Sequence, residues 1–535
     1  MSRVQVLTVV GFVVLSIGFA NSATARTTEP VRSSSKASAP VSGASYDVLQ
    51  FDYDAQHSGD DTLETAISVT NVASLRKVFQ VSFPNTVDGA PMYLSAVSTP
   101  TGAQDLLFVN TKAGQIIALN AHTGAQVWTH QYPAGACVFG TPPVRCYTPS
   151  SPAVDPNRQY VYAYGLDAKV HKYQVGDGTE ITGNGWPEPT SAKMVNGTPM
   201  VEKVTSNLSI ATAKNGTSYL YVGHSSKDDG PADYQGHLTT INLADGTQHV
   251  FNDVCSNQVD VYFVLAPGTP DCATVQSGIW ARSGAVYLPD TDRIFVATGN
   301  GLFDPTNYYW GYSVFSLNPD GTGSSTTPGV PLDSYTVPDW NSLKDADLGS
   351  TAPAILPTPA NSNVKHLAVQ GGKEGILRLL NLDNLSGQGG PGFTGGEVFS
   401  MTVPMTGETL TAPAVWVDPA DGTTWCFYTN ANGLAALRLA VDASGNPSLQ
   451  TMWQTTPGGS SPIIANNILF VATSNLIRAM DPVTGNLLWS DTTIAGIHFE
   501  SPMVANGMLF ITDESRELNA YALFQPSVFL PLIEK

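Results

Sequence analysis

One pattern occurs in residues 105–129, DLLFVNTKAGQIIALNAHTGAQVWT, and again in residues 467–490, NILFVATSNLIRAMDPVTGNLLWS. Each stretch has an apolar strand, a polar turn, a second strand ending in a dipeptide that contains Asn or Asp, a Thr-Gly turn, and a third strand that carries Trp128 or Trp489. Alternating apolar residues between Gly, Asn and Asp turns are typical of antiparallel strands joined by hairpins. The pattern therefore predicts an all-β chain.

The length of the repeat follows from SPIIANNILFVA, which begins at Ser461, and SPMVANGMLFIT, which begins forty residues later at Ser501. About four strands in forty-odd residues is the size of one blade of a β-propeller. Weaker copies of the unit begin near Ser151, Asn207, Gly284, Ala352 and Ala412.

Counting from Gly89 gives eight units, and the last of them, 497–524, has only three clear strands. A strand without a unit of its own, LRKVFQVSF (Leu75–Phe83), precedes the first unit. Pairing this strand with the last unit closes a ring and removes two open edges. The sequence thus predicts one eight-bladed β-propeller of four-stranded antiparallel blades, closed by an N-terminal strand. Several independent sandwiches also give many short strands, but they do not explain a repeat of blade length.

The composition agrees with one large core and excludes two classes of partner. The chain has 535 residues with 25 Lys or Arg, 44 Asp or Glu and a formal net charge of -19; only 13% of its residues are charged and 42% are hydrophobic. Length alone suggests about three or four domains, but the repeat reduces this number to one ring. Because an acidic surface repels phosphates and anionic headgroups, we expect no nucleic-acid partner and no charge-driven membrane binding.

The N-terminus has the features of a secretory signal in residues 1–25, with Arg3 before an apolar stretch, Val4–Ala20, and small residues Ala23 and Ala25 at the cleavage position. The alternative is an uncleaved membrane anchor, although the stretch is short for a full span. We expect a secreted, periplasmic or cell-surface protein with no membrane insertion after cleavage.

Residues 26–44 are rich in Ser, Thr, Ala and Pro without hydrophobic periodicity, so they are predicted to be a flexible leader. The propeller is expected over 45–526. The last residues, 527–535, form a short apolar tail that either packs on the propeller or acts as a sorting feature.

Five cysteines remain after export. In an oxidising compartment, Cys137 with Cys146 and Cys255 with Cys272 are the natural local disulfides. Cys426 lies in the strand-like TWCFYTN and is predicted to be a buried free thiol. Their spacings fit no zinc pattern, and without a C-x-x-C-H motif no covalent c-type haem is expected.

The order of strand, ALNAHTG or AMDPVTG, and then Trp resembles the repeat of pyrroloquinoline-quinone (PQQ) propellers. This family includes quinoprotein alcohol dehydrogenases and many non-catalytic relatives. The resemblance covers nearly everything from Tyr46 to Leu523, and YDAQHSGDDTLETAISVTNVASLRKVFQVSF is similar to the opening segment of the dehydrogenases. It implies that Trp128 and Trp489 are core residues that dock between neighbouring blades.

In the dehydrogenases the cofactor is a flat, tricarboxylated anion held against an aromatic plane, with Ca²⁺ polarising its reactive carbonyl and a carboxylate base taking the alcohol proton. The segment GIWARSGAVYLPDTDRIFVATGNG (278–301) resembles the part that supplies this aromatic floor and a calcium ligand. By that resemblance Trp280 stacks on the quinone and Asn300 binds calcium. The alternative is that Trp280 belongs to the core and Asn300 is a turn residue.

The segment VQGGKEGILRLLNLDNLSG (369–387) is similar to the dehydrogenase strand whose cation hydrogen-bonds the quinone carbonyls, and Lys373 occupies that position. A cation in an apolar, Gly-rich stretch needs a partner. An anionic ligand is one possibility; Glu374 or a nearby Asp is the other.

Two further positions depart from the dehydrogenase pattern. Where the dehydrogenases offer a Glu to calcium, this sequence has none in 223–246, although Asp229 or Asp233 could substitute. Matching DADL in PDWNSLKDADLGSTAPAIL (338–356) to the family's D-x-D-like sequence puts Ser342 at the catalytic Asp, whereas a slip of three residues puts Asp345 there. Because Ser is no general base at neutral pH unless another group activates it, Asp345 is the predicted base. The adjacent Cys-Cys pair that covers the quinone in many of these enzymes is absent.

Two functions are therefore open. The first is an exported oxidoreductase that uses PQQ and calcium to oxidise a small alcohol or sugar. The second is a non-catalytic propeller that presents loops to a protein or glycan partner, which the missing Cys-Cys pair, the uncertain base and the lack of a haem domain favour. We expect a monomer in either case. The sequence contains no G-x-S-x-G, H-E-x-x-H or P-loop motif that points to another chemistry.

Overall fold

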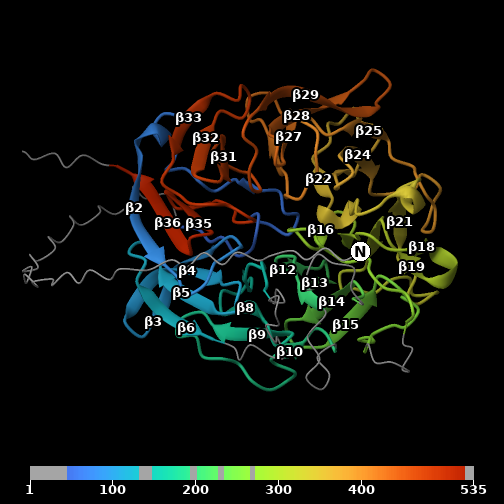
Figure 1. The fold of residues 1–535 in the computed structure, drawn as a ribbon, viewed down its shortest axis with the longest axis horizontal. Helices are drawn as coiled ribbons and strands as arrows, with labels where there is room; N and C mark the ends of the chain where they lie inside the picture. Colours follow the sequence, from blue (N-terminus) through green and yellow to red (C-terminus); the bar gives the residue numbers. More distant parts are fainter. Residues whose placement is uncertain (1–44, 132–146, 193–201, 227–233, 265–271, 525–535) are drawn as a thin grey trace, which may run out of the picture. The chain divides into compact units, whose positions relative to one another are not determined.

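The computed structural model describes residues 45–131, 147–192, 202–226, 234–264 and 272–524, all of which belong to one compact unit. These residues form eight antiparallel blades, each built on four strands, arranged in a ring (Figure 1). The prediction of a single all-β, eight-bladed propeller is confirmed. Within the described ranges, we find no helix with the length and apolar character needed to cross a bilayer.

The first four blades follow one another along the chain. The first contains β3 (Met92–Thr99), β4 (Gly102–Asn110), β5 (Ile116–Asn120) and β6 (Gln126–His130). The second contains β7 (Ala153–Val154), β8 (Tyr160–Gly165), β9 (Lys169–Gln174) and β10 (Glu188–Pro189). The third contains β11 (Glu202–Val204), β12 (Ser209–Thr212), β13 (Ser218–Ser226), β14 (His237–Asn242) and β15 (Gln248–Asn252), with β11 and β12 both pairing with β13. The fourth contains β16 (Val286–Leu288), β17 (Arg293–Ala297), β20 (Ser313–Leu317) and β21 (Asp333–Thr336).

The other four blades complete the ring. The fifth contains β22 (Ala354–Leu356), β23 (Leu367–Gln370), β24 (Ile376–Asn381) and β25 (Phe399–Thr402). The sixth contains β26 (Ala414–Val417), β27 (Thr424–Thr429), β28 (Leu434–Val441) and β29 (Pro447–Thr455). The seventh contains β30 (Ile463–Ala465), β31 (Ile468–Thr473), β32 (Leu476–Met480) and β33 (Leu487–Asp491). The eighth contains β34 (Met503–Ala505), β35 (Met508–Asp513), β36 (Glu517–Leu523) and, from the N-terminal side, β2 (Leu75–Ser82).

A few short elements lie outside this scheme. The strand β1 (Asp60–Asp61) adds to the seventh blade in parallel with β30. A small hairpin of β18 (Phe303–Asp304) and β19 (Tyr309–Trp310) is inserted between β17 and β20. The described residues also contain four 3-10 turns: η1 (Val72–Ser74), η2 (Pro305–Asn307), η3 (Trp340–Ser342) and η4 (Leu348–Ser350).

The ring closes through the N-terminal strand, as predicted. The strand β2 pairs antiparallel with β36, with Leu75 opposite Leu523 and Gln80 opposite Asn519. In Figure 1 the blue β2 accordingly lies beside the red β36. The eighth blade thus takes its outer strand from the start of the propeller, and the pairing covers the edge that β36 otherwise exposes.

The repeated Trp and Thr-Gly turn are explained by contacts between blades. Trp128 is buried, and its Nε1 donates to the carbonyl of Val175 in the second blade at 2.9 Å. A Cβ added to Gly178, the turn glycine of that second blade, would lie 2.6 Å from the Trp128 ring. Trp489 is likewise buried and donates to the carbonyl of Leu75 in the eighth blade at 3.1 Å. The predicted core role of both tryptophans is confirmed.

The low charge of the chain also follows from this packing. Buried clusters extend from each blade to the next; one of them joins Phe108 and Trp128 of the first blade to Val161 and Tyr173 of the second. Cys426 is a buried free thiol in the core of the fifth and sixth blades, as predicted. Strands that are covered on both faces have little room for charged side chains.

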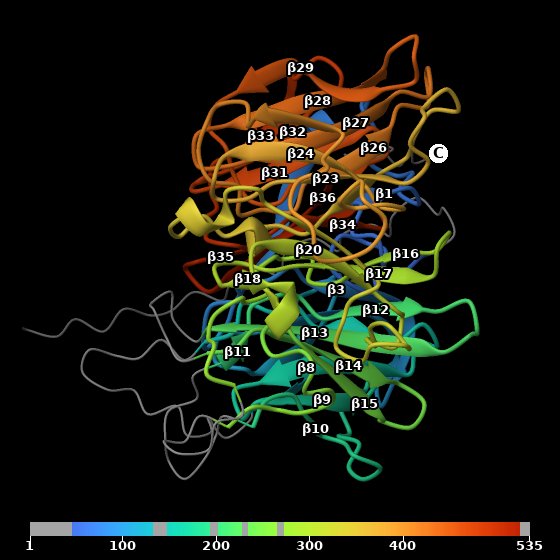
Figure 2. The same cartoon turned by 90° about the vertical axis from the view of Figure 1, so that its right-hand side faces the viewer.

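The order of strands within a blade decides where the site residues lie. In each antiparallel blade, the link from the previous blade and the turn between the second and third strands are at the same end of the strands. Figure 2 shows the blades from the side, with β16 and β17 of the fourth blade between strands of the third and fifth. Residues far apart in sequence therefore meet on one face of the ring.

Several predictions lie outside the described residues and stay predictions. They are the signal and leader in 1–44, the Cys137–Cys146 disulfide, the possible calcium ligands Asp229 and Asp233, and the tail 527–535.

Candidate functional site

A cavity of about 930 Å³ opens among the loops on this face. Its volume is at the upper end of the range that is usual for small-molecule sites. Trp280, Asn300, Asp345 and Lys373 all line it, and they come from four separate loops of the fourth and fifth blades. The structure therefore brings the four predicted site residues into a single cavity.

The lining of the cavity has the opposite charge balance to the whole chain. The chain has 25 Lys or Arg against 44 Asp or Glu. The described lining instead has four cationic residues, Lys203, Arg282, Lys344 and Lys373, against three acidic ones, Asp345, Asp347 and Glu408. A cavity that gathers cations in an acidic protein favours an anionic ligand.

Lys373 forms ion pairs with two carboxylates of the preceding loop. Its Nζ lies 2.8 Å from Oδ2 of Asp347 and 3.0 Å from Oδ1 of Asp345. Burial acts to lower the pKa of Lys373, but the charge of Asp347 and the hydrogen bonds to both carboxylates outweigh burial and raise the pKa above its ordinary value. The ammonium is thus held charged. Glu374, the alternative partner considered from sequence, pairs with Arg378 instead.

Asn300 connects the same carboxylates to the end of β17. Its backbone N–H donates to Oδ1 of Asp347 at 2.7 Å, and its Nδ2 donates to Oδ1 of Asp345 at 3.2 Å. Its Oδ1 accepts from the Tyr312 hydroxyl at 2.7 Å and from the backbone N–H of Ala346 at 3.1 Å. Burial and the charge of Asp347 raise the pKa of Tyr312 to about 12, so this hydroxyl remains a donor at neutral pH. The side chain is a hydrogen-bonding link and not only a turn residue.

Trp280 lies against a glycine that the Thr-Gly-Asn sequence supplies. A Cβ on Gly299 would come within 2.8 Å of the Trp280 ring and 2.2 Å of Oδ1 of Asp347. The ring of Tyr234 meets the Trp280 ring edge-on, with centroids 5.9 Å apart at 80°. These contacts fix an indole that is partly exposed to the cavity. Trp280 is therefore a wall of the cavity and not a fully buried core residue.

The two aspartates of DADL and Ser342 occupy different environments. The Asp347 side chain is 4% exposed, with each oxygen hydrogen-bonded or ion-paired. The Asp345 side chain is 78% exposed, and among the described residues its Oδ2 has no hydrogen-bond partner. Ser342 is not among the residues lining the cavity, and its hydroxyl donates to the carbonyl of Asp339. Of the two positions considered for the base, only Asp345 offers an open oxygen at the cavity.

The centre of the ring holds a cation that sequence analysis did not select. Arg282 is buried, and its guanidinium donates to the carbonyls of Thr205 at 3.0 Å and Pro149 at 2.8 Å, which precede inner strands of the third and second blades. The same group lies 5.2 Å from the ring centre of Phe499, just before the eighth blade. Arg282 therefore connects the segments that run into the second, third and eighth blades, and it forms part of the cavity wall.

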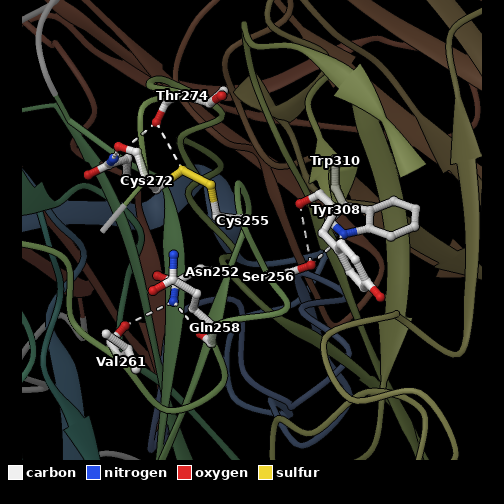
Figure 3. Close-up of a disulfide and its surroundings, with 10 residues drawn as sticks. Asn252, Cys255, Ser256, Gln258, Val261, Cys272, Thr274, Tyr308 and Trp310 are labelled. Atoms are coloured by element: carbon white, nitrogen blue, oxygen red, sulfur yellow. Dashed lines mark hydrogen bonds between the residues drawn. A yellow bond between two sulfur atoms is a disulfide. The ribbon is translucent and has the colours of Figure 1, made fainter. Parts of the chain in front are cut away.

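The Cys255–Cys272 disulfide, predicted from spacing, is present (Figure 3). Cys255 follows β15, and Cys272 begins the segment that runs on to Trp280. The Nε2 of Gln235 donates to the carbonyls of Cys272 and Thr274, at 3.0 Å each. Residues 273–276, immediately after the disulfide, line the cavity.

Sequence reasoning missed Asp347, Arg282 and Tyr312. Arg282 stands two residues after Trp280 in an apolar stretch, so the argument that singled out Lys373 applied to it as well. Asp347 is the second acidic residue of DADL and shared the signal that pointed to Asp345. Tyr312 stands directly before β20 and gave no separate signal.

Comparison with solved structures finds a similar fold in three alcohol dehydrogenases. A europium-containing methanol dehydrogenase superposes with a TM-score of 0.62 at 13% identity, covering 89% of this chain and 98% of that one. A quinohemoprotein alcohol dehydrogenase from Pseudomonas putida gives 0.61 at 13% identity, and one from Comamonas testosteroni gives 0.59 at 14%; each match covers 89% of this chain and 80% of the other. Identities this low establish a common fold and leave the activity open. No curated protein matches the sequence.

A family model described as outer membrane protein assembly factor BamB matches residues 76–246 and 435–523, slightly less than half of the chain. Trp280, Asn300, Asp345 and Lys373 fall between the two matched parts. The match therefore covers the repeat and part of the cavity lining, but none of these four residues. Together, the ring of eight blades and the structural likenesses show an eight-bladed β-propeller with the fold of these alcohol dehydrogenases, and the family model matches its repeat over part of the chain.

Proposed function

We propose that this propeller binds a flat, polyanionic quinone of the PQQ type in the cavity and uses it to oxidise a small alcohol or sugar. One observation carries the proposal: Trp280, Asn300, Asp345 and Lys373, selected from three separate segments of the sequence, line the same cavity.

The residues present fit a planar anion. Trp280 offers an aromatic surface whose position is fixed by Tyr234 and Gly299. The cationic lining supplies partners for carboxylates, which bind guanidinium and ammonium groups in charge-assisted hydrogen bonds. Lys373 forms an ion pair with Asp345. A ligand that stacks on Trp280 and hydrogen-bonds to Lys373 therefore lies near the open oxygen of the Asp345 carboxylate.

In the proposed reaction the chain positions the substrate and moves its proton. When bound, the quinone supplies the oxidant for the two-electron conversion of an alcohol to a carbonyl compound. Asp345 accepts the hydroxyl proton at Oδ2, while its Oδ1 is held by Lys373 and Asn300. Asp347 keeps Lys373 in place from the buried side.

Calcium, the second cofactor that the resemblance implies, does not fit the arrangement of the described residues. Ca²⁺ takes six to eight oxygen ligands. The Oδ1 of Asn300 already accepts two hydrogen bonds, and both nearby carboxylates are paired with the Lys373 ammonium. No step of the proposed reaction is therefore routed through a calcium ion.

The proposed place of action is outside the cytoplasm. A disulfide next to the cavity fits an oxidising compartment, and the apolar N-terminal stretch has the features of an export signal. We propose a secreted, periplasmic or cell-surface location.

Purified protein incubated with PQQ tests the function. We expect a saturable rise in melting temperature and dye-coupled oxidation of at least one alcohol or sugar in a substrate panel. Absence of both thermal stabilisation and turnover contradicts the proposal. Stabilisation without turnover supports a quinone-binding propeller and rejects the oxidoreductase.

A second candidate is a non-catalytic propeller that binds a protein or glycan partner. The observation in its favour is the family model, whose description is an assembly factor and not an enzyme. The two candidates differ in what a change in the cavity does. Lys373→Ala abolishes quinone-dependent turnover if the chain is an enzyme, whereas a partner that binds loops on the surface is unaffected by it.

A further inference from the structure

We propose that the ammonium of Lys373 is the resident cation of this site and takes the place of a divalent metal ion between Asp345 and Asp347. The inference goes beyond the proposed function, because it concerns the cation requirement of the protein and holds whether or not a quinone binds. It predicts a site that is assembled without calcium.

The first argument is the geometry of the ion pairs. Asp345 and Asp347 are separated by one residue, and a carboxylate oxygen of each lies within 3.0 Å of the same Nζ. Two carboxylates that converge on one point are an arrangement that proteins use for a bound cation. Here a side chain of the protein itself fills that point.

The second argument is the orientation of Asn300. Its amide group directs Nδ2, a donor, toward Asp345, and its Oδ1 accepts from Tyr312 and Ala346. An amide that ligates a metal directs its oxygen toward the ion and toward the ion's other ligands. The hydrogen bonds around Asn300 therefore favour an ammonium next to Asp345 and do not favour a metal ion.

The third argument is charge. Asp347 is buried, and a buried carboxylate requires a cationic or hydrogen-bonding partner. Lys373 provides that partner from the turn after β23. A divalent ion added to the same two carboxylates has to displace an ammonium that is covalently part of the protein, or else lie next to it against Coulomb repulsion.

The experiment measures Ca²⁺ binding by calorimetry and by thermal shift, with no quinone present. The variants are Lys373→Met, which removes the charge and keeps much of the side-chain length, Lys373→Arg, which keeps the charge, Asp347→Asn alone, and the double variant Lys373→Met with Asp347→Asn. Lys365→Met serves as a matched control, because Lys365 is an exposed lysine 3.7 Å from a single carboxylate, that of Asp290.

We expect no saturable Ca²⁺ stabilisation of the wild type, of Lys373→Arg or of Lys365→Met. We expect Lys373→Met to gain one Ca²⁺ site, at least about tenfold tighter than any residual binding by the wild type, with an upward shift in melting temperature that Asp347→Asn removes. Restored thermal stability of Lys373→Met in calcium identifies the ion as the replacement for the ammonium.

Two results overturn the inference. One is saturable Ca²⁺ binding by the wild type that Asp347→Asn abolishes. The other is a folded Lys373→Met that gains no Ca²⁺ site. If Lys373→Met does not fold, the wild-type titration with and without Asp347→Asn still decides the question. Because no quinone is used, a failure here is distinct from a failure to bind PQQ.

Discussion

The Nζ of Lys373 lies 2.8 Å from Oδ2 of Asp347, which joins the turn after β23 to the loop before β22 within the fifth blade. Asp347 also accepts a hydrogen bond from the backbone of Asn300 at the end of β17, so the same carboxylate holds the fourth and fifth blades together at the cavity. Removing one partner of a buried ion pair leaves an uncompensated charge and is strongly destabilising. The cavity and the packing of these two blades therefore depend on one another.

Asp345→Asn tests the proposed base. Asp345 has a positive φ of 48°, which Asn tolerates well, so the backbone is expected to keep its conformation. Because Asn cannot accept the proton, kcat should fall by a factor of about 10² to 10⁴, while the thermal shift that PQQ produces is retained. Steady-state kinetics and thermal shift measure the two effects.

Ser342→Ala is the matched control for this change. Ser342 was the alternative position in the sequence, but it is not among the residues lining the cavity. Its loss should leave kcat close to that of the wild type, because the side chain is exposed and does not line the cavity. A larger fall in kcat for Ser342→Ala than for Asp345→Asn contradicts the assignment.

Trp489→Ala tests the closure of the ring. Trp489 is buried, and its Nε1 bonds the carbonyl of Leu75 in the strand that completes the eighth blade. Truncating a buried Trp lowers the free energy of unfolding by about 3 to 5 kcal/mol. Leu487→Ala on the same strand is the control, since Leu487 is 59% exposed and such positions change stability by about 0.5 kcal/mol or less. Equal melting temperatures for the two variants contradict the role given to Trp489.

Glu500→Gln tests a buried carboxyl beside the cavity. Burial and the charge of Asp88 raise the pKa of Glu500 to about 9, against about 4.3 in an unfolded chain. Between these values the folded state holds a proton that the unfolded state has lost, so the contribution of Glu500 to stability falls as pH rises. Gln carries no such dependence. The difference in melting temperature, variant minus wild type, should therefore increase from pH 5 to pH 9. If the two proteins give parallel curves of melting temperature against pH, the assignment is contradicted.

Replacing Cys255 and Cys272 together by Ser tests whether the disulfide supports a wall of the cavity. Closing a loop of this length, with a sequence separation of 17, stabilises a protein by about 3 kcal/mol. Since residues 273–276 line the cavity, the variant should melt at a lower temperature and also bind PQQ more weakly. Calorimetric titration separates these effects, and unchanged PQQ affinity in a destabilised variant rejects the proposed support of the cavity.

The fold could be predicted from sequence because its signal is repeated. The Thr-Gly turn and the Trp that follows recur, and each copy marks the same contact between blades, such as Trp128 on Gly178. The last repeat unit lacks a fourth strand, and the strand that begins at Leu75 has no unit of its own. Pairing the two was therefore the one consistent solution, and in the structure this strand pairs with β36.

The site was predicted less completely, because its contacts form between residues that are distant in sequence. Nothing in the segment around Lys373 specifies that its partner is Asp347 and not the adjacent Glu374. The direction in which Asn300 points its amide depends on Tyr312 and Ala346, which fold onto it from other segments. Arg282 contacts the segments that run into separate blades, and these segments come together only when the ring closes.

The most direct test of the central claim is the crystal structure of the protein soaked with PQQ. The account predicts the quinone in the cavity, stacked on Trp280, with a quinone oxygen within hydrogen-bond distance of Lys373 Nζ and Asp345 Oδ2 facing the open side. Quinone density elsewhere on the molecule, or none at a concentration that saturates known PQQ proteins, would contradict it.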